Sequence, residues 1–368
     1  MNDADFLARR LATLRQAGQF RELPLRQCGV DFWSNDYLGF SRLLKPDSEE
    51  EIIAPGSRLI SGNHPSINEL EARIAAFHGY PAGLLFGSGY TANLGLLSSL
   101  AGRTDTIVYD ELIHASLRDG IRLSGAAARR FKHNHVEEAH DMLARAKPGG
   151  QVFLVTEGRF SMDGDTAPLP ELAEICRETG AHMIVDEAHS IGLEGVKGSG
   201  LVAACGLQER VFASVMTYGK APGFHGAAVL GSTSLRDYLI NFCRPFIFST
   251  GPRPGQITGI RQVYNLLDNR QTEAYQQLRH VVEVYRQSVS KLFPVTDGPI
   301  QLLAVPGNDE VMEMEDWLVS EGFLVKAIRS PSVPQGTERL RICLHAFNTP
   351  AEVKRLVRLL TEGRKKWQ

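Results

Sequence analysis

Short apolar runs alternate with helical stretches through the middle of the chain. The runs are AGLLFGS (82–88), DTIVYDE (105–111), AAARRFK (126–132), GQVFLVTEG (150–158), AHMIVDEAH (181–189), RVFASVMTYG (210–219) and GAAVLGS (226–232). Most of them contain β-branched residues and are bounded by Gly, Asp or polar turns. Buried strands separated by helices are typical of an α/β domain with a largely parallel sheet. We therefore predict an α/β fold for this region.

The flanking regions predict smaller elements. The chain to about Arg26 is predicted to be helical, and DFWSNDYLGF (31–40) to form a short strand and turn. In SINELEARIAAFHGY (66–80) the apolar residues have helical spacing, and Ser66 with Glu69 fits a capping box at the start of a helix. Towards the C-terminus, long helical stretches lead to strand-like LLAV, FLVKAI and LRICLH, which favour a smaller α+β domain.

The length of the chain predicts more than one packed unit. A chain of 368 residues is too long for one simple core, so two or three units are expected. We predict an N-terminal helix and strand segment over residues 1–36, a large α/β domain over 37–267 and a C-terminal α+β domain over 268–368.

Composition and charge exclude several classes of protein. Forty basic and 42 acidic side chains give a formal net charge of −2, which gives no support to a nucleic-acid-binding surface. No stretch reaches the roughly 18 apolar residues that a membrane span needs. The five cysteines are far apart, so neither a zinc site nor a disulfide framework is expected. We expect a water-soluble, cytoplasmic protein without a metal site.

Two residues that follow predicted strands point to a cofactor. Asp186 ends the run MIVD and Lys220 follows SVMTYG, so both side chains are expected at the carboxyl edge of the sheet, where such sheets bind ligands. A lone Asp is often a helix cap and a lone Lys is usually solvated. Together they suit pyridoxal phosphate, because a lysine forms the Schiff base and a carboxylate keeps the pyridine nitrogen protonated.

Neighbouring residues strengthen this interpretation. GSGYTAN (87–93) precedes a helical run, and its small residues allow backbone N–H groups to approach a phosphate, although a plain strand-to-helix turn has the same pattern. His114 can stack on the cofactor or move a proton, and His189 can reach its phenolic oxygen. Either histidine alone would more often be a core or capping residue.

Several blocks of sequence resemble one family over nearly the whole chain. SNDYLGF, GSRLISGNHPSINELE, TEGRFSMDGDTAPL, VDEAHSIG and TYGKAPGFHGAAVLGS are similar to the α-oxoamine synthases, a branch of the fold-type I pyridoxal-phosphate enzymes. The resemblance implies a fold-type I transferase, with a large domain around a mostly parallel sheet, a smaller C-terminal α+β domain and pyridoxal 5'-phosphate as cofactor.

The resemblance also implies roles for individual residues. Lys220 is expected to form the Schiff base, Asp186 to contact the pyridine nitrogen and His114 to stack on the ring. The remaining cofactor contacts are expected from Gly89, Tyr90, Ser161, His189 and Thr217, and, from the second subunit of a homodimer, from Ser249 and Thr250. Substrate contacts are expected from Arg21, Asn35, His114, Ser332 and Arg341.

The implied reaction is a decarboxylative condensation of an amino acid with an acyl thioester. IRSPSVPQGTERLRICLHAFNT is most similar to the branch that joins L-alanine to a pimeloyl thioester in biotin biosynthesis. A sibling synthase that uses glycine or serine, and a non-catalytic cofactor-binding module, remain as alternatives. Two departures from the family concern the surroundings of the site: only about 15 residues separate Phe40 from Gly56, and Tyr218 and Pro222 are unusual neighbours of Lys220.

Overall fold

The computed structural model describes residues 5–20, 28–45, 56–146, 149–289 and 293–367. The chain divides into two compact units. Unit 1 comprises Met1–Tyr37, Met162–Gly164 and Gln276–Gln368, and unit 2 comprises Leu38–Ser161 and Asp165–Tyr275. Unit 1 therefore brings together the two ends of the chain, and a three-residue loop from the middle of the sequence clusters with them.

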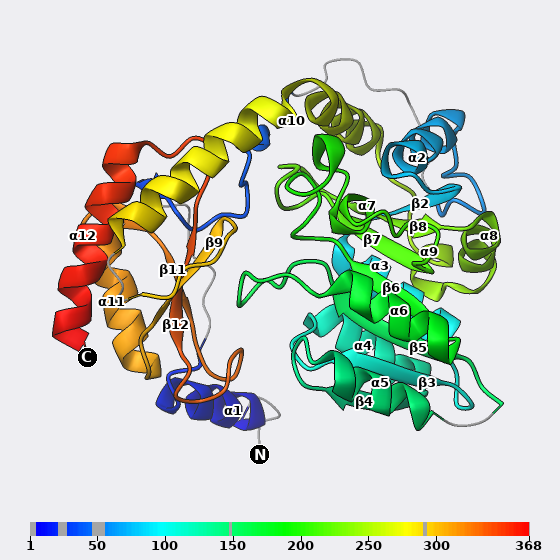
Figure 1. The fold of residues 1–368 in the computed structure, drawn as a ribbon, viewed down its shortest axis with the longest axis horizontal. Helices are drawn as coiled ribbons and strands as arrows, with labels where there is room; N and C mark the ends of the chain where they lie inside the picture. The colour runs from blue at the N-terminus through cyan, green and yellow to red at the C-terminus, as the bar shows by residue number, and fades with distance from the viewer. Residues whose placement is uncertain (1–4, 21–27, 46–55, 147–148, 290–292, 368) are drawn as a thin grey trace. The chain divides into compact units, whose positions relative to one another are not determined.

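Unit 2 is built on a seven-stranded sheet (Figure 1). Its strands, in sheet order, are β2 (Ala82–Phe86), β8 (Ala227–Gly231), β7 (Ala213–Thr217), β6 (His182–Asp186), β5 (Val152–Glu157), β3 (Thr106–Asp110) and β4 (Ala127–Phe131). Only β8 runs antiparallel to its neighbours within this sheet. All seven predicted strands are present, and the predicted α/β fold with a largely parallel sheet is confirmed.

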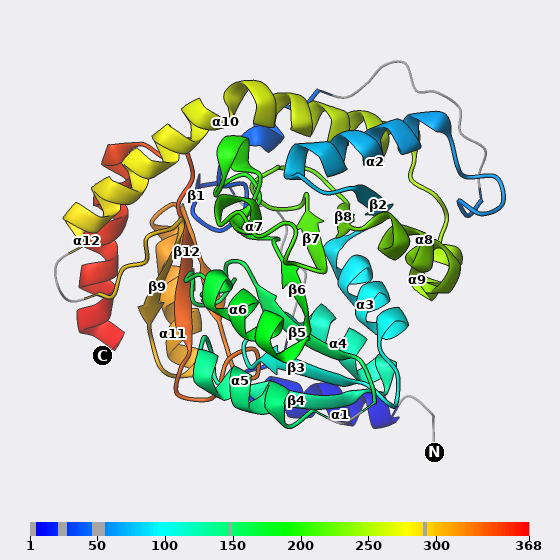
Figure 2. The ribbon, with the colours of Figure 1, turned by 45° about the vertical axis from the view of Figure 1, so that its right-hand side comes forward.

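Helices cover both faces of this sheet. α3 (Gly89–Leu100) packs with α4 (Ala115–Ser124) on one face, and α5 (Val136–Ala144) packs with α6 (Leu169–Thr179) on the other (Figures 1 and 2). This division follows from right-handed crossovers, because the chain moves along the sheet in one direction through α3 and α4 and in the opposite direction through α5 and α6. The strands are consequently buried on both faces, which explains their continuous apolar runs.

The remaining elements of unit 2 surround this core. They are η1 (Phe40–Arg42), α2 (Pro65–His78), η2 (Val196–Gly198), α7 (Leu201–Ala204), α8 (Thr233–Phe242), α9 (Arg244–Ile247) and α10 (Pro254–Ser288) as far as Tyr275. The predicted capping box at α2 is wrong. Pro65 is already helical, the imidazole of His64 accepts the Ser66 N–H as the cap, and Glu69 instead pairs with Arg261. A proline is favoured at the first helical position because it has no N–H to satisfy, so the helix begins at Pro65 and its cap is His64, two residues before Ser66.

Unit 1 contains two small sheets. β1 (Val30–Asp31) pairs with β10 (Phe323–Leu324), and β11 (Lys326–Ile328), β12 (Arg339–Cys343) and β9 (Ile300–Ala304) form an antiparallel sheet. α11 (Asn308–Ser320) packs against this sheet and against α12 (Pro350–Trp367).

The N-terminal helix is shorter than predicted. α1 (Asp5–Gln16) ends ten residues before Arg26. Gly18 adopts a left-handed conformation with φ of 62°, and the Gln19 N–H bonds back to Leu14 O, so the helix closes with a glycine turn.

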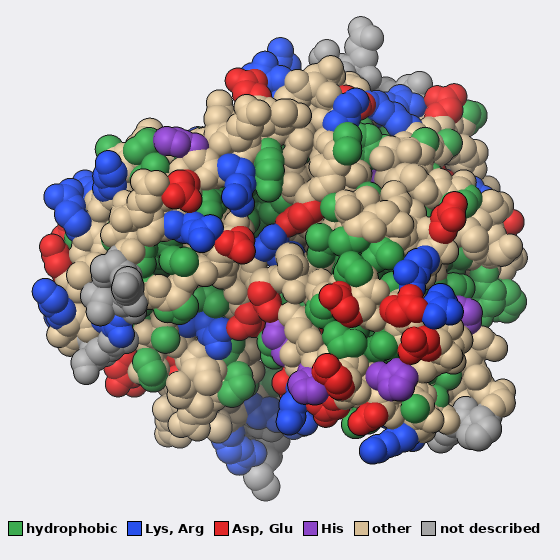
Figure 3. Space-filling view, in the orientation of Figure 1, with side chains coloured by type: hydrophobic (Ala, Val, Ile, Leu, Met, Phe, Trp, Pro, Cys, Tyr) green, Lys and Arg blue, Asp and Glu red, His purple; other side chains and the backbone are tan. Residues whose placement is uncertain are grey.

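The molecular surface carries both signs of charge. Lys and Arg side chains are interspersed with Asp and Glu on the face drawn in Figure 3, in line with 40 basic and 42 acidic residues. Among the described residues, no helix has the length and apolar character that a bilayer crossing demands.

Candidate active site

A cavity of about 180 Å³ lies at the carboxyl edge of the sheet in unit 2. Strands β5, β6 and β7 end at it, and the N-termini of α3 and α4 border it. Its lining consists of Gly89, Tyr90, Asn93, His114, Ser116, Glu157, Ser161, Asp186, Ala188, His189, Thr217 and Lys220. Eight of these were predicted as cofactor-binding residues, so strand ends that are far apart in sequence meet around one space.

Asp186 is the buried acid of this cavity. Its carboxylate accepts hydrogen bonds from Asn93 Nδ2 at 2.6 Å and from the Ala188 N–H at 2.9 Å. Burial raises the pKa of Asp186, whereas these two hydrogen bonds and the charges of His114 and Lys220 lower it. A cationic ligand group beside this carboxylate would favour its charged form further.

His114 caps α4 and presents its ring to the same cavity. Its Nδ1 accepts the Ser116 N–H at 3.2 Å and lies 2.8 Å from Ser116 Oγ. Nδ1 is therefore an acceptor, and the proton of the neutral ring is on Nε2. Burial lowers the pKa of His114, Asp186 raises it and Lys220 lowers it. A largely neutral imidazole can both cover a flat ring and exchange a proton near neutral pH.

Lys220 sits in a tightly closed turn that follows β7. The Tyr218 N–H donates to Gly226 O, the Phe224 N–H to Tyr218 O and the Gly223 N–H to Lys220 O. Behind the turn, the buried Tyr218 hydroxyl is 3.2 Å from the Tyr264 hydroxyl, which is 2.8 Å from His78 Nε2. The backbone on either side of Lys220 is thus anchored to the sheet and to two helices.

The start of α3 is shaped to receive an anion. Ser88 caps the helix by accepting the Thr91 N–H, and Gly89 is its first helical residue. A Cβ on Gly89 would collide with the side chain of Thr217. Only glycine lets the helix N-terminus approach the end of β7 this closely, and backbone N–H groups at such a terminus favour phosphate.

Comparisons with known proteins agree with this geometry. The aminotransferase class I and II family model matches residues 29–360. An 8-amino-7-oxononanoate synthase from Alkalilimnicola ehrlichii is 41% identical over 345 residues, covering 90% of this chain and 87% of that protein. One from Emericella nidulans is 40% identical over 370 residues, with 90% and 89% covered. The chain belongs to the 8-amino-7-oxononanoate synthases of the class I and II aminotransferase family.

Solved structures confirm the fold. Serine palmitoyltransferase from S. paucimobilis with a bound PLP–myriocin aldimine aligns with a TM-score of 0.87 at 25% identity, covering 99% of this chain and 98% of that one. The 8-amino-7-oxononanoate synthase of Francisella tularensis aligns with a TM-score of 0.77 at 27% identity, covering 92% and 98%. The fold-type I architecture and the α-oxoamine synthase resemblance expected from the sequence are therefore confirmed.

Three polar residues of the cavity were missed by the sequence analysis. Asn93 holds Asp186 from α3, Ser116 holds the ring of His114, and Glu157 ends β5 and accepts the His114 N–H at 2.6 Å. All three lie inside or next to blocks that had been singled out. Asn93 could have been found as the position one helical turn after Gly89, on the same helix face.

Ser249 and Thr250 line a different cavity. It measures about 130 Å³ and is bordered by Arg58, Phe86 and Phe246 among others. The structure of one chain does not bring these two residues to the Lys220 cavity. Their assignment to the cofactor of a second subunit stays a prediction.

The predicted substrate residues in unit 1 form a small polar cluster. Arg341, 8% exposed, donates from Nη2 to Asn35 Oδ1 at 2.7 Å and to Tyr37 Oη at 3.1 Å. Ser332 is exposed on the loop that follows β11. Arg21 lies outside the described residues. Arg341 thus does not point outward from its strand, which was the alternative for an alternating run.

The residues present fit pyridoxal phosphate. The cavity offers an amine, a carboxylate, an aromatic imidazole and a glycine-bordered helix N-terminus. In addition, Asn93 Oδ1 is buried without a hydrogen-bond partner among the described residues. Buried polar atoms in proteins are normally satisfied, so this one marks a place where a further group belongs.

Proposed function

We propose that this chain is a pyridoxal-phosphate enzyme that condenses L-alanine with a pimeloyl thioester. The reaction forms 8-amino-7-oxononanoate and releases carbon dioxide and the carrier thiol. The observation that carries this proposal is that Lys220, Asp186 and His114 meet in one cavity of a chain whose relatives are 8-amino-7-oxononanoate synthases. Its widely spaced cysteines suit a reducing compartment, and we place it in the cytoplasm.

The cofactor and the side chains divide the chemistry. When bound, pyridoxal phosphate supplies an electron sink for negative charge on the α carbon of the amino acid. The Lys220 amine takes the α proton and returns a proton at the end. The negatively charged Asp186 carboxylate would keep the pyridine nitrogen of the bound cofactor protonated. His114, neutral and fixed by Ser116, covers the ring and can pass a proton to the reacting carbonyl oxygen.

The remaining residues would hold the cofactor. The N–H groups at Gly89 and Tyr90 and the hydroxyl of Thr217 would take the phosphate. Ser161 and His189 would bond the phenolic oxygen. Ser249 and Thr250 would reach the phosphate from a second copy, so we propose a homodimer with shared active sites.

The cluster around Arg341 would bind a substrate carboxylate. A guanidinium group gives a carboxylate two parallel charge-assisted hydrogen bonds. Asn35 holds Arg341 in place and belongs to the same cluster. Ser332 and Arg21 are assigned to the amino acid or the acyl chain by their motifs alone.

A substrate matrix tests the proposal. Enzyme loaded with pyridoxal phosphate is incubated with alanine, glycine or serine, each with pimeloyl and shorter acyl thioesters, and the amino ketone is identified by mass. Highest turnover with alanine and the pimeloyl thioester is expected. Better turnover with glycine and a short acyl group would assign the chain to a sibling synthase. Cofactor binding without any amino ketone would favour a non-catalytic module.

A further inference from the structure

Glu157 and Asp186 are neighbouring acids on adjacent strands. β5 and β6 are parallel, and Glu157 pairs in register with Asp186. Residues in register on parallel strands project to the same side of the sheet, and the strands lie about 4.8 Å apart. Both acids line the Lys220 cavity. A second carboxyl group therefore stands beside the one assigned to the pyridine nitrogen.

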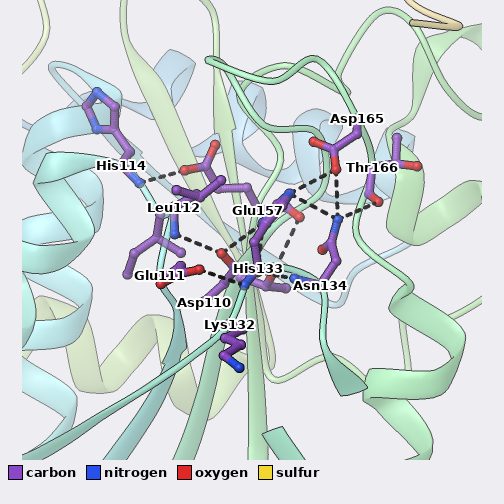
Figure 4. Close-up of polar contacts among 12 residues, drawn as sticks. Asp110, Glu111, Leu112, His114, Lys132, His133, Asn134, Glu157, Asp165 and Thr166 are labelled. Atoms are coloured by element: carbon purple, nitrogen blue, oxygen red, sulfur yellow. Dashed lines mark hydrogen bonds and ion pairs between the residues drawn. The ribbon is translucent and has the colours of Figure 1, made fainter. Parts of the chain in front are cut away.

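A close hydrogen bond from the backbone of His114 holds the Glu157 carboxyl group, and it is the one that the described residues supply to this group. The His114 N–H donates to Glu157 Oε1 at 2.6 Å, and Figure 4 shows this bond reaching from the end of β5 to the start of α4. Glu157 is 3% exposed. Since the same histidine caps α4 through its ring, its backbone and its imidazole are both held, by Glu157 and by Ser116.

The three acids at the sheet edge, Asp110, Asp186 and Glu157, have different numbers of positively charged or hydrogen-bonding partners. On β3, Asp110 faces the His133 imidazole, with Nδ1 at 3.0 and 3.1 Å from its two oxygens (Figure 4). Asp186 faces Lys220 and His114 and receives two N–H groups. Burial, followed by the charges of Asp186 and Asp110, raises the pKa of Glu157 well above its usual value, and the His114 N–H and Lys220 oppose this only in part.

Two buried carboxyl groups side by side cannot both ionise at modest cost. The one with fewer donors takes the proton. Asp186 has a side-chain amide and a backbone N–H, whereas the hydrogen bond to Glu157 comes from one backbone N–H. The proton of the pair accordingly resides on Glu157.

We propose that Glu157 is a positioning residue that acts as a neutral acid: it holds His114 over the cofactor and leaves Asp186 as the single negative charge at the pyridine nitrogen. This inference rests on the proposed function for its role in catalysis. Its protonation and its hold on His114 are properties of the chain itself and can be measured without substrate.

Two variants of Glu157 distinguish a neutral positioning residue from one that carries a charge or transfers a proton. Glu157→Gln keeps the carbonyl oxygen that accepts the His114 N–H and is neutral, so kcat and KM within about 3-fold of wild type are expected. Glu157→Ala leaves the buried N–H without an acceptor, and kcat should fall about 10- to 100-fold. Glu178→Gln, the same change at a half-exposed position on α6, is the matched control.

Spectroscopy supplies readouts that do not depend on turnover. Infrared difference spectra of the cofactor-free protein, wild type minus Glu157→Gln, should contain the carbonyl band of a protonated carboxyl group. The pH midpoint of the visible absorbance of bound pyridoxal phosphate should be the same in both proteins, because no charge is removed. These outcomes hold even if the wild-type enzyme makes a different amino ketone.

Three results would overturn the inference. They are carboxylate bands in place of the carboxyl band, a shift of the cofactor midpoint by about one pH unit in Glu157→Gln, and a loss of more than about 10-fold in kcat for folded Glu157→Gln. Each would show that Glu157 carries a charge or transfers a proton. All three results are measured on wild type and Glu157→Gln, so the inference can be tested even if Glu157→Ala does not fold.

Discussion

The sheet edge of unit 2 and the arginine cluster of unit 1 both bury charged groups, but the hydrogen-bond partners of these groups differ. At the sheet edge, acids face cations: Asp110 faces the His133 imidazole, and Asp186 faces the Lys220 amine. In the cluster, the hydrogen-bond partners identified for Arg341 are the neutral oxygens of Asn35 and Tyr37.

This difference indicates what each region is prepared to bind. An internally balanced edge can hold a zwitterionic cofactor and move protons without large changes in net charge. In the cluster, Asn35 and Tyr37 orient the Arg341 guanidinium, whose planar fork matches the two oxygens of a carboxylate. Substitutions at the sheet edge should therefore lower turnover, whereas substitutions in the arginine cluster should raise KM for the amino acid.

Removing the amine at the sheet edge should have the largest effect. Lys220→Ala takes away the group that receives the α proton, so turnover should fall by at least about 1000-fold, as measured by mass detection of the amino ketone. Borohydride should also label wild type with the cofactor and leave the variant unlabelled. Lys354→Ala, at an exposed position on α12, should behave as wild type. Residual turnover within 10-fold of wild type would assign the proton transfer to another group.

Removing the arginine should weaken binding more than chemistry. Arg341→Ala should raise KM for the amino acid roughly 10- to 100-fold with a smaller change in kcat, because a charge-assisted contact to the carboxylate is lost. Arg341→Lys should recover part of the loss, since the charge remains but the planar fork does not. Arg358→Ala on α12 is the exposed control. An unchanged KM in both Arg341 variants would remove the carboxylate assignment.

The stability that protonated His133 contributes at the sheet edge should decrease at high pH. Burial alone would lower the pKa of His133, but hydrogen bonds to Asp110 and Asp165 raise it to about 10. A raised pKa means that the protonated form stabilises the fold fully below about pH 6.5, and that this contribution is lost as the pH rises towards 10.

The thermal midpoint of the cofactor-free protein measures this effect. Between pH 7 and pH 10 the difference between wild type and His133→Gln should shrink by about 2 to 4 °C, because partial exposure of His133 limits the free energy to about 1 kcal/mol. His280→Gln, at an exposed site on α10, should show no such trend. A difference that stays constant over this range would mean that His133 is neutral in the folded protein.

The sequence predicted the strands better than the contacts between them. All seven strands of the main sheet were found because each is a continuous apolar run, and parallel strands buried on both faces require such runs. Helix boundaries were less predictable: Ser66 and Glu69 fit a capping box, but α2 begins at Pro65 and is capped by His64.

The site was predicted where motifs carried it and missed where tertiary contacts did. Glu157 and Asn93 gain their roles from contacts with residues 43 and 93 positions away, His114 and Asp186, which no local pattern encodes. Ser249 and Thr250 line another cavity of the chain, so their predicted role depends on a second copy.

The smallest expected effect concerns the support behind Lys220. His78 Nδ1 donates to Ser199 O, so Nε2 of this neutral ring accepts from the Tyr264 hydroxyl, and the Tyr218 hydroxyl donates to Tyr264. Tyr218→Phe removes the terminal donor and should cost about 1 kcal/mol of stability. Tyr264→Phe also leaves the buried His78 nitrogen without its donor and should cost about 1 to 3 kcal/mol.

Thermal midpoints of the two cofactor-free variants test this order. Tyr264→Phe should lie below Tyr218→Phe, and Tyr275→Phe on α10 should match wild type, because its side chain lies outside this chain of hydroxyls. If the Tyr218 variant were the less stable one, losing the donor to Tyr264 would cost more than losing the donor to His78. The turn that carries Lys220 would then depend chiefly on the hydroxyl of Tyr218, which lies two residues before the lysine in the sequence.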